Sequence, residues 1–97
     1  MKESEYIAGF LCYLREAVTR HNIAEADEKE ANAQTQDILH RLELYDDVYS
    51  ETERLGELLR QVRRKRRKAK NAREALAPIA DWAKDNEGLI SRLNRTL

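Results

Sequence analysis

Residues 7–45 read IAGFLCYLREAVTRHNIAEADEKEANAQTQDILHRLELY, and this stretch decides the fold class. A seven-residue repeat runs through it, and no Gly or Pro interrupts it after Gly9. Such a repeat predicts one long amphipathic helix, from about residue 3 to residue 45. One seam position holds Phe10, Ala17, Ala24, Ala31, Ile38 and Tyr45. The other holds Ile7, Leu14, His21, Glu28, Thr35 and Leu42.

A second helix is expected at about residues 51–86. Ser50 and Glu53 have the spacing of a capping box, and Asp46 and Asp47 favour a turn over about residues 46–50. Pro78 either bends this helix or breaks it. A short third helix is expected at about residues 89–96, after a stop at Gly88. Apolar residues of the second helix fall at positions 55, 58, 59, 62, 69, 72, 76, 79, 80 and 83.

Two long helices joined by about five residues should fold back into an antiparallel hairpin. If Leu42 faces Leu55, then Ile38 faces Leu59 and the acids at 25–30 lie beside residues 66–72. The alanines of the two helices then also meet. We therefore predict an all-α, coiled-coil-like hairpin with a short C-terminal helix, as one domain over residues 1–97. Because a chain of this length has a thin core, we also expect a homo-oligomer.

Several classes of protein are disfavoured by composition. Cys12 is the only cysteine, which rules out an internal disulfide and favours a reducing compartment. We expect Cys12 to be a small buried residue of the first helix. No run approaches the roughly 20 apolar residues of a membrane span, and nothing resembles a signal peptide. We expect a cytoplasmic protein without a membrane partner.

The charges are segregated along the chain. Residues 1–57 carry 14 acids and 6 bases, whereas residues 58–97 carry 4 acids and 12 bases, so the total is neutral. Between Leu58 and Arg73 there are nine bases and no acid: Arg60, Arg63, Arg64, Lys65, Arg66, Arg67, Lys68, Lys70 and Arg73.

Helical azimuth divides this run into two groups. Lys65, Arg66 and Arg73 flank or interrupt the apolar stripe, where they would pair with Glu25, Glu28 and their neighbours or line a ligand pocket. An outward face is formed by Arg60, Arg63, Arg64 and Arg67.

We expect no acid to lie within reach of these four arginines, so their side chains should repel one another. An anionic partner would relieve the repulsion: nucleic acid, a phosphorylated ligand or an acidic protein surface. A merely solvated face is the other reading. For nucleic acid, the chain lacks a basic total charge and aromatics interleaved with the bases.

Catalytic patterns are not found in the sequence. His21 and His40 are 19 residues apart without ligand or acid–base spacing, and there is no glycine-rich phosphate loop or nucleophile elbow. We expect no enzyme, no cofactor and no metal site. Tyr6, Phe10 and Tyr13 share one helix face, which favours a core or dimer contact over a ligand cage.

One resemblance covers residues 37–83. The order DILHRLEL (37–44), LLR (58–60), RRKRRKAK (63–70) and LAPI (76–79) resembles small uncharacterised helical proteins of phages and prophages of Gram-positive bacteria. That resemblance implies an early or accessory phage protein that acts in the host cytoplasm by binding a host component. The group has no assigned activity, so no residue role is carried over.

Three functions remain open from the sequence. The first is a non-catalytic interaction protein that binds an anionic macromolecule or a host protein through the arginine face. The second is an oligomeric anti-defence sponge that sequesters a nucleotide signal, with Lys65, Arg66 and Arg73 lining its pocket. The third is a structural coiled-coil scaffold.

Overall fold

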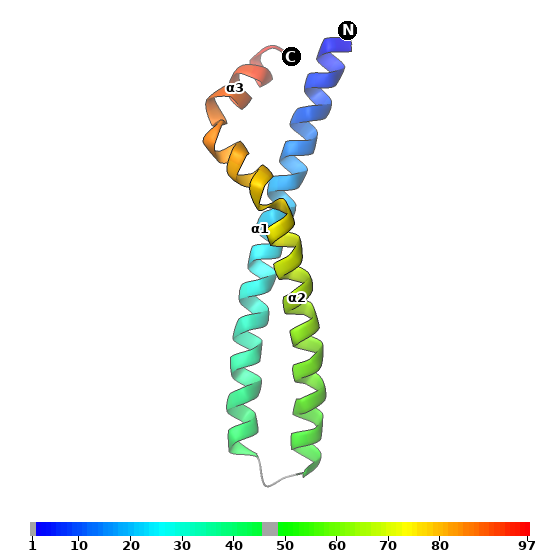
Figure 1. Cartoon of the computed structure of the whole chain (residues 1–97), viewed down its shortest axis with the longest axis vertical. Helices are drawn as coiled ribbons and strands as arrows, with labels where there is room; N and C mark the ends of the chain where they lie inside the picture. Colours follow the sequence, from blue (N-terminus) through cyan, green and yellow to red (C-terminus); the bar gives the residue numbers. More distant parts are fainter. Residues whose placement is uncertain (1, 46–48) are drawn as a thin grey trace. The chain divides into compact units, whose positions relative to one another are not determined.

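The computed structural model describes residues 2–45 and 49–97, and these residues form three α-helices (Figure 1). They are α1 (Lys2–Leu44), α2 (Tyr49–Asp85) and α3 (Glu87–Arg95). The all-α class and the helical hairpin are confirmed. Asp46 and Asp47, the expected turn residues, lie outside the described residues.

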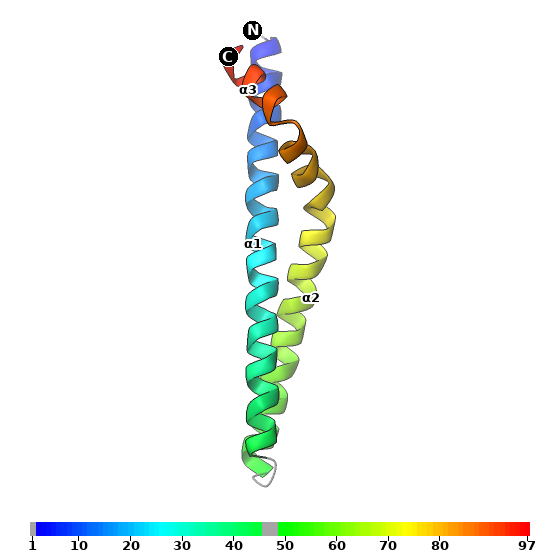
Figure 2. The same ribbon diagram turned by 90° about the vertical axis from the view of Figure 1, so that its left-hand side faces the viewer.

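The chain divides into two compact units. We call residues 24–71 the hairpin unit, and Met1–Ile23 with Ala72–Leu97 the terminal unit. In the hairpin unit α1 and α2 run antiparallel and side by side, as Figures 1 and 2 both show. Ala31, Ile38, Leu55 and Val62 form its buried cluster, with Leu42, Leu58 and Leu59 packed against it.

This cluster explains why the two stripes meet in this register. Leu55 is fully buried, Ile38 belongs to the cluster, and Leu59, which the sequence pairs with Ile38, packs against the same cluster. Thr35 occupies a seam position despite its hydroxyl, because its Oγ1 donates to the Ala31 carbonyl oxygen at 2.8 Å. Its polar atom is therefore satisfied within its own helix.

The start of α2 differs from the expected capping box. The helix begins at Tyr49, so Ser50 lies in its first turn and not before it. Thr52 connects the two helices, because its Oγ1 donates to the carbonyl oxygen of Tyr45 at 3.2 Å. That carbonyl, just past the end of α1, is one of the groups that helix hydrogen bonds leave open.

The terminal unit has a smaller core, formed by buried Leu11, Leu14, Ala17 and Ala83. Phe10 meets Trp82 edge to face, with ring centroids 5.9 Å apart and an interplanar angle of 75°. Of the two outcomes considered for Pro78, a break is wrong, because α2 continues through it to Asp85. Pro78 itself is exposed.

Asn86, not Gly88, separates α2 from α3. Its side-chain Nδ2 donates to the Trp82 carbonyl oxygen at 2.8 Å, and its own carbonyl accepts from the Ile90 amide at 3.0 Å. Asn86 therefore closes one helix and opens the next. Gly88 lies in the first turn of α3 and has no positive φ.

In the described parts of the chain, residues 2–45 and 49–97, no helix has both the length and the apolar character needed to span a membrane.

Candidate functional site: a basic segment on α2

The middle of α2 carries six consecutive bases, Arg63, Arg64, Lys65, Arg66, Arg67 and Lys68. We call these residues the basic segment. All six are exposed, and buried Val62 and Ala69 flank them on the seam. Because six consecutive helical residues point in every direction, the segment also occupies azimuths at which the stripe would otherwise place apolar side chains.

The outward arginine face is smaller than the sequence suggested. The expectation that no acid reaches Arg60 is wrong: its Nη1 donates to Glu57 Oε2 at 3.0 Å, an i,i+3 pair. Glu57 shares this face of α2 one turn earlier, so it partly cancels the charge there. Among the described residues, the side chains of Arg63, Arg64 and Arg67 have no hydrogen-bond or ion-pair partner.

The residues of the alternative ligand pocket have different environments. Arg66 Nε donates to Asn32 Oδ1 at 2.6 Å, a bond across the hairpin to an amide and not to the expected acids. Lys65 is exposed, whereas Arg73 is half-buried and belongs to the terminal unit. Glu25, one of the acids expected to pair with them, lies 3.8 Å from Lys29 on its own helix.

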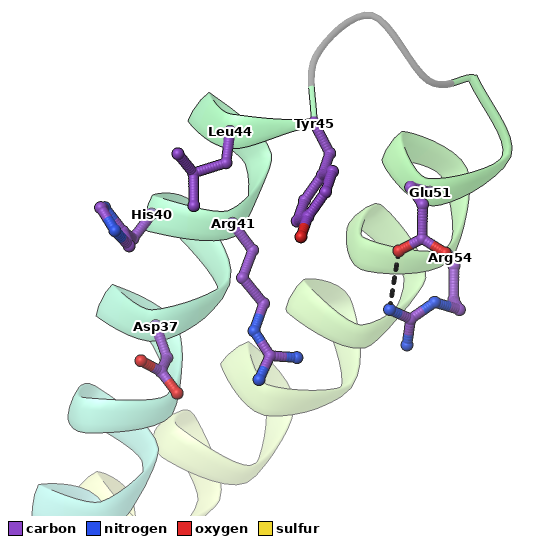
Figure 3. Close-up of a pocket in the computed structure, with 7 residues that line it drawn as sticks. All are labelled: Asp37, His40, Arg41, Leu44, Tyr45, Glu51 and Arg54. Carbon is purple, nitrogen blue, oxygen red and sulfur yellow. Dashed lines mark hydrogen bonds and ion pairs between the residues drawn. The ribbon is translucent and has the colours of Figure 1, made fainter.

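A shallow hollow lies where α1 ends and α2 begins (Figure 3). Arg41 and Tyr45 extend toward the space between the helices, whereas His40 points away from α2. Arg54 lies 2.9 Å from Glu51 Oε2, and this hydrogen bond with its charge holds the pKa of Glu51 below its ordinary value, with a smaller contribution from Arg41. The lining residues are Asp37, His40, Arg41, Leu44, Tyr45, Glu51 and Arg54.

Two acids and two arginines balance in this hollow, so it offers no net attraction to an anion or a cation. Arg54, the base that α2 contributes to the lining, is already bonded to Glu51. The hollow therefore does not compete with the basic segment as an anion site.

The side chains considered for catalysis or metal binding differ in their exposure. His21 is half-buried, with its Nδ1 3.5 Å from Asn22 Oδ1, and His40 lies in the other unit. Cys12, expected to be buried, is exposed. Over residues 2–45 and 49–97, no group of three or more His, Cys, Asp or Glu side chains is placed to hold a metal ion.

Comparison of the chain with protein-family models, with curated proteins and with solved structures finds no match.

Proposed function

We propose that this chain is a non-catalytic binding protein whose basic segment holds an anionic macromolecule, with the phosphate backbone of nucleic acid as the partner that suits it best. One observation carries the proposal: Arg63, Arg64 and Arg67 are exposed and make no pair within the described chain. Guanidinium groups match phosphate oxygens in a bidentate geometry, and so arginine is favoured over lysine at such contacts.

The repulsion among Arg63, Arg64 and Arg67 favours an anionic partner. Like charges at i,i+3 and i,i+4 destabilise a helix by about 0.2–0.5 kcal/mol per pair, and Arg63, Arg64 and Arg67 contain two such spacings. An anion bound across them would remove this repulsion. Accessory action on a host component, which the resemblance to phage proteins implies, fits the same surface and belongs to this proposal.

The test is binding of a labelled DNA duplex, followed by fluorescence anisotropy over a range of salt concentrations. The variant Arg63→Gln/Arg64→Gln/Arg67→Gln should lose most of the affinity. It should also lower the slope of log K against log salt by about 0.9 for each phosphate contact removed, or roughly 2.7 for three. Circular dichroism should show unchanged helicity, because none of the three side chains is buried.

A matched control variant has the same net charge as this triple variant. Arg15→Gln/Arg20→Gln/Arg92→Gln also removes three exposed arginines, none of them in the basic segment. If both triple variants weaken binding equally, overall charge and not the segment is responsible. Binding of polyglutamate but not of duplex would assign an acidic protein surface instead, and binding of neither would reject the proposal.

A further inference from the structure

The N-terminal part of α1 presents an exposed aromatic patch around Gly9. Tyr6, Gly9, Phe10 and Tyr13 stand at i, i+3, i+4 and i+7, which are the four corners of a hole in knobs-into-holes packing. Tyr6 is 76% exposed, Phe10 41% and Tyr13 53%. The edge-to-face contact with Trp82 covers only one side of Phe10. Three aromatic side chains thus remain in water around one glycine.

Gly9 has no role that the single chain explains. A helical Gly destabilises the helix by about 0.5–1 kcal/mol relative to Ala, yet Gly9 has no positive φ that would require it. A Cβ built at Gly9 would meet nothing within 4 Å. What the missing side chain does provide is a flat point where another helix backbone can approach closely.

The charges around Gly9 indicate what approaches. Lys2 and Glu16 lie seven residues before and seven residues after it, two helical turns away on the same face, and both are exposed. An antiparallel copy related by a two-fold axis at Gly9 would place each Lys2 opposite the Glu16 of the other copy. The same operation places Tyr6 beside Tyr13 of the second copy. Such a surface is complementary to itself, as a two-fold interface requires.

The exposed area is large enough for such a contact. The chain exposes 7598 Å², whereas a folded monomer of 11.4 kDa exposes roughly 5,800 Å² by the usual scaling of area with mass. A stable interface covers about 800 Å² on each partner. The chain as a whole therefore exposes roughly 1,800 Å² more than a compact monomer of its mass, and the exposed Tyr6, Phe10 and Tyr13 are part of that surface.

We propose that the Tyr6, Gly9, Phe10 and Tyr13 face is the interface with a second copy of this chain, packed antiparallel about a two-fold axis at Gly9. The contact involves only the terminal unit and does not depend on the basic segment. It fixes one geometry, in which helix α1 of each copy crosses the other at its glycine.

Sedimentation equilibrium of the full chain tests the proposal. The wild type should be a dimer, and Gly9→Gln should weaken it by at least about tenfold, equivalent to 1.4 kcal/mol, by placing two side chains at the closest approach. Gly56→Gln is the matched control. Gly56 is also helical with nothing within 4 Å of a built Cβ, but it belongs to the hairpin unit. Circular dichroism should show that both variants keep their helicity.

A charge exchange tests the antiparallel arrangement. Lys2→Glu and Glu16→Lys should each weaken the dimer at low salt, and the double variant should restore it, because the two charges face each other across the axis. A wild type that stays monomeric at every concentration overturns the proposal, as does a dimer that Gly9→Gln leaves intact. A double variant weaker than either single one would refute the two-fold axis at Gly9.

Discussion

The pair between Glu57 and Arg60 makes a specific prediction about the basic segment. Arg60 lies three residues before Arg63, or about 4.5 Å along the helix axis, and its guanidinium is 3.0 Å from the Glu57 carboxylate. Replacing Glu57 by Gln removes the competing anion and one negative charge from this face. We therefore expect Glu57→Gln to bind duplex DNA more tightly than the wild type.

The size of the effect follows from counterion release. One additional phosphate contact steepens the slope of log K against log salt by about 0.9. Over a fourfold rise in salt concentration, Glu57→Gln should then lose about 3.5-fold more affinity than the wild type loses. The fold should barely respond, since an exposed pair of this kind contributes about 0–1 kcal/mol. Fluorescence anisotropy across a salt series measures both the affinity and the slope.

The same helix supplies a matched control. Glu51 and Arg54 form an equivalent i,i+3 pair at 2.9 Å, but Arg54 lies nine residues from Arg63, or about 14 Å along the axis. That separation exceeds the Debye length of about 10 Å at 0.1 M salt. Glu51→Gln should therefore leave the slope unchanged. If Glu51→Gln steepens the slope as much as Glu57→Gln does, or if neither variant changes it, Arg60 does not adjoin the binding surface.

Two further predictions concern the hairpin unit. Leu55→Ala should lower the free energy of unfolding by about 2–5 kcal/mol, because Leu55 is 0% exposed. Leu44 is 63% exposed, so Leu44→Ala should change the free energy of unfolding by less than about 0.5 kcal/mol. Urea denaturation followed by circular dichroism measures both values. The Glu51 carboxyl should titrate below its ordinary pKa in NMR, and Arg54→Gln should raise that pKa. Because the pKa of Glu51 is lower in the folded state, its pair with Arg54 stabilises the fold at pH values above the ordinary pKa of glutamate. This stabilisation is lost as the pH falls through the lowered pKa of Glu51.

Much of the hairpin can be predicted because its determinants are local. Ala24, Ala31 and Ile38 repeat every seven residues and are all buried, as the heptad reading requires. Near the N-terminus the heptad prediction is wrong at one position. It places Phe10 on the seam, but Phe10 is 41% exposed, whereas its neighbour Leu11 is 3% exposed. The seam itself continues, since Leu14 and Ala17 are buried at the heptad positions that the sequence assigns to them, so Phe10 is a local exception near the N-terminus of α1.

The contacts of the arginines on α2 divide in the same way. The bond between Arg60 and Glu57 is predictable, because i,i+3 spacing on one helix brings the two side chains together whatever packs beside them. The bond between Arg66 and Asn32 is not predictable from spacing, because it depends on the axial register of two helices to within a fraction of a turn. The charge pattern predicted an acid as the partner of Arg66, but its partner is the side-chain amide of Asn32.

The basic segment also interrupts the core at a measurable cost. Lys65 and Arg66 stand between buried Val62 and Ala69, at azimuths where a leucine would contribute about 1.5–3 kcal/mol on burial. A sequence under pressure for stability alone would continue the apolar stripe there. Rules of packing are broken in natural proteins mainly where function requires it. The interrupted stripe therefore favours the proposed binding role of the basic segment, in addition to the repulsion among Arg63, Arg64 and Arg67.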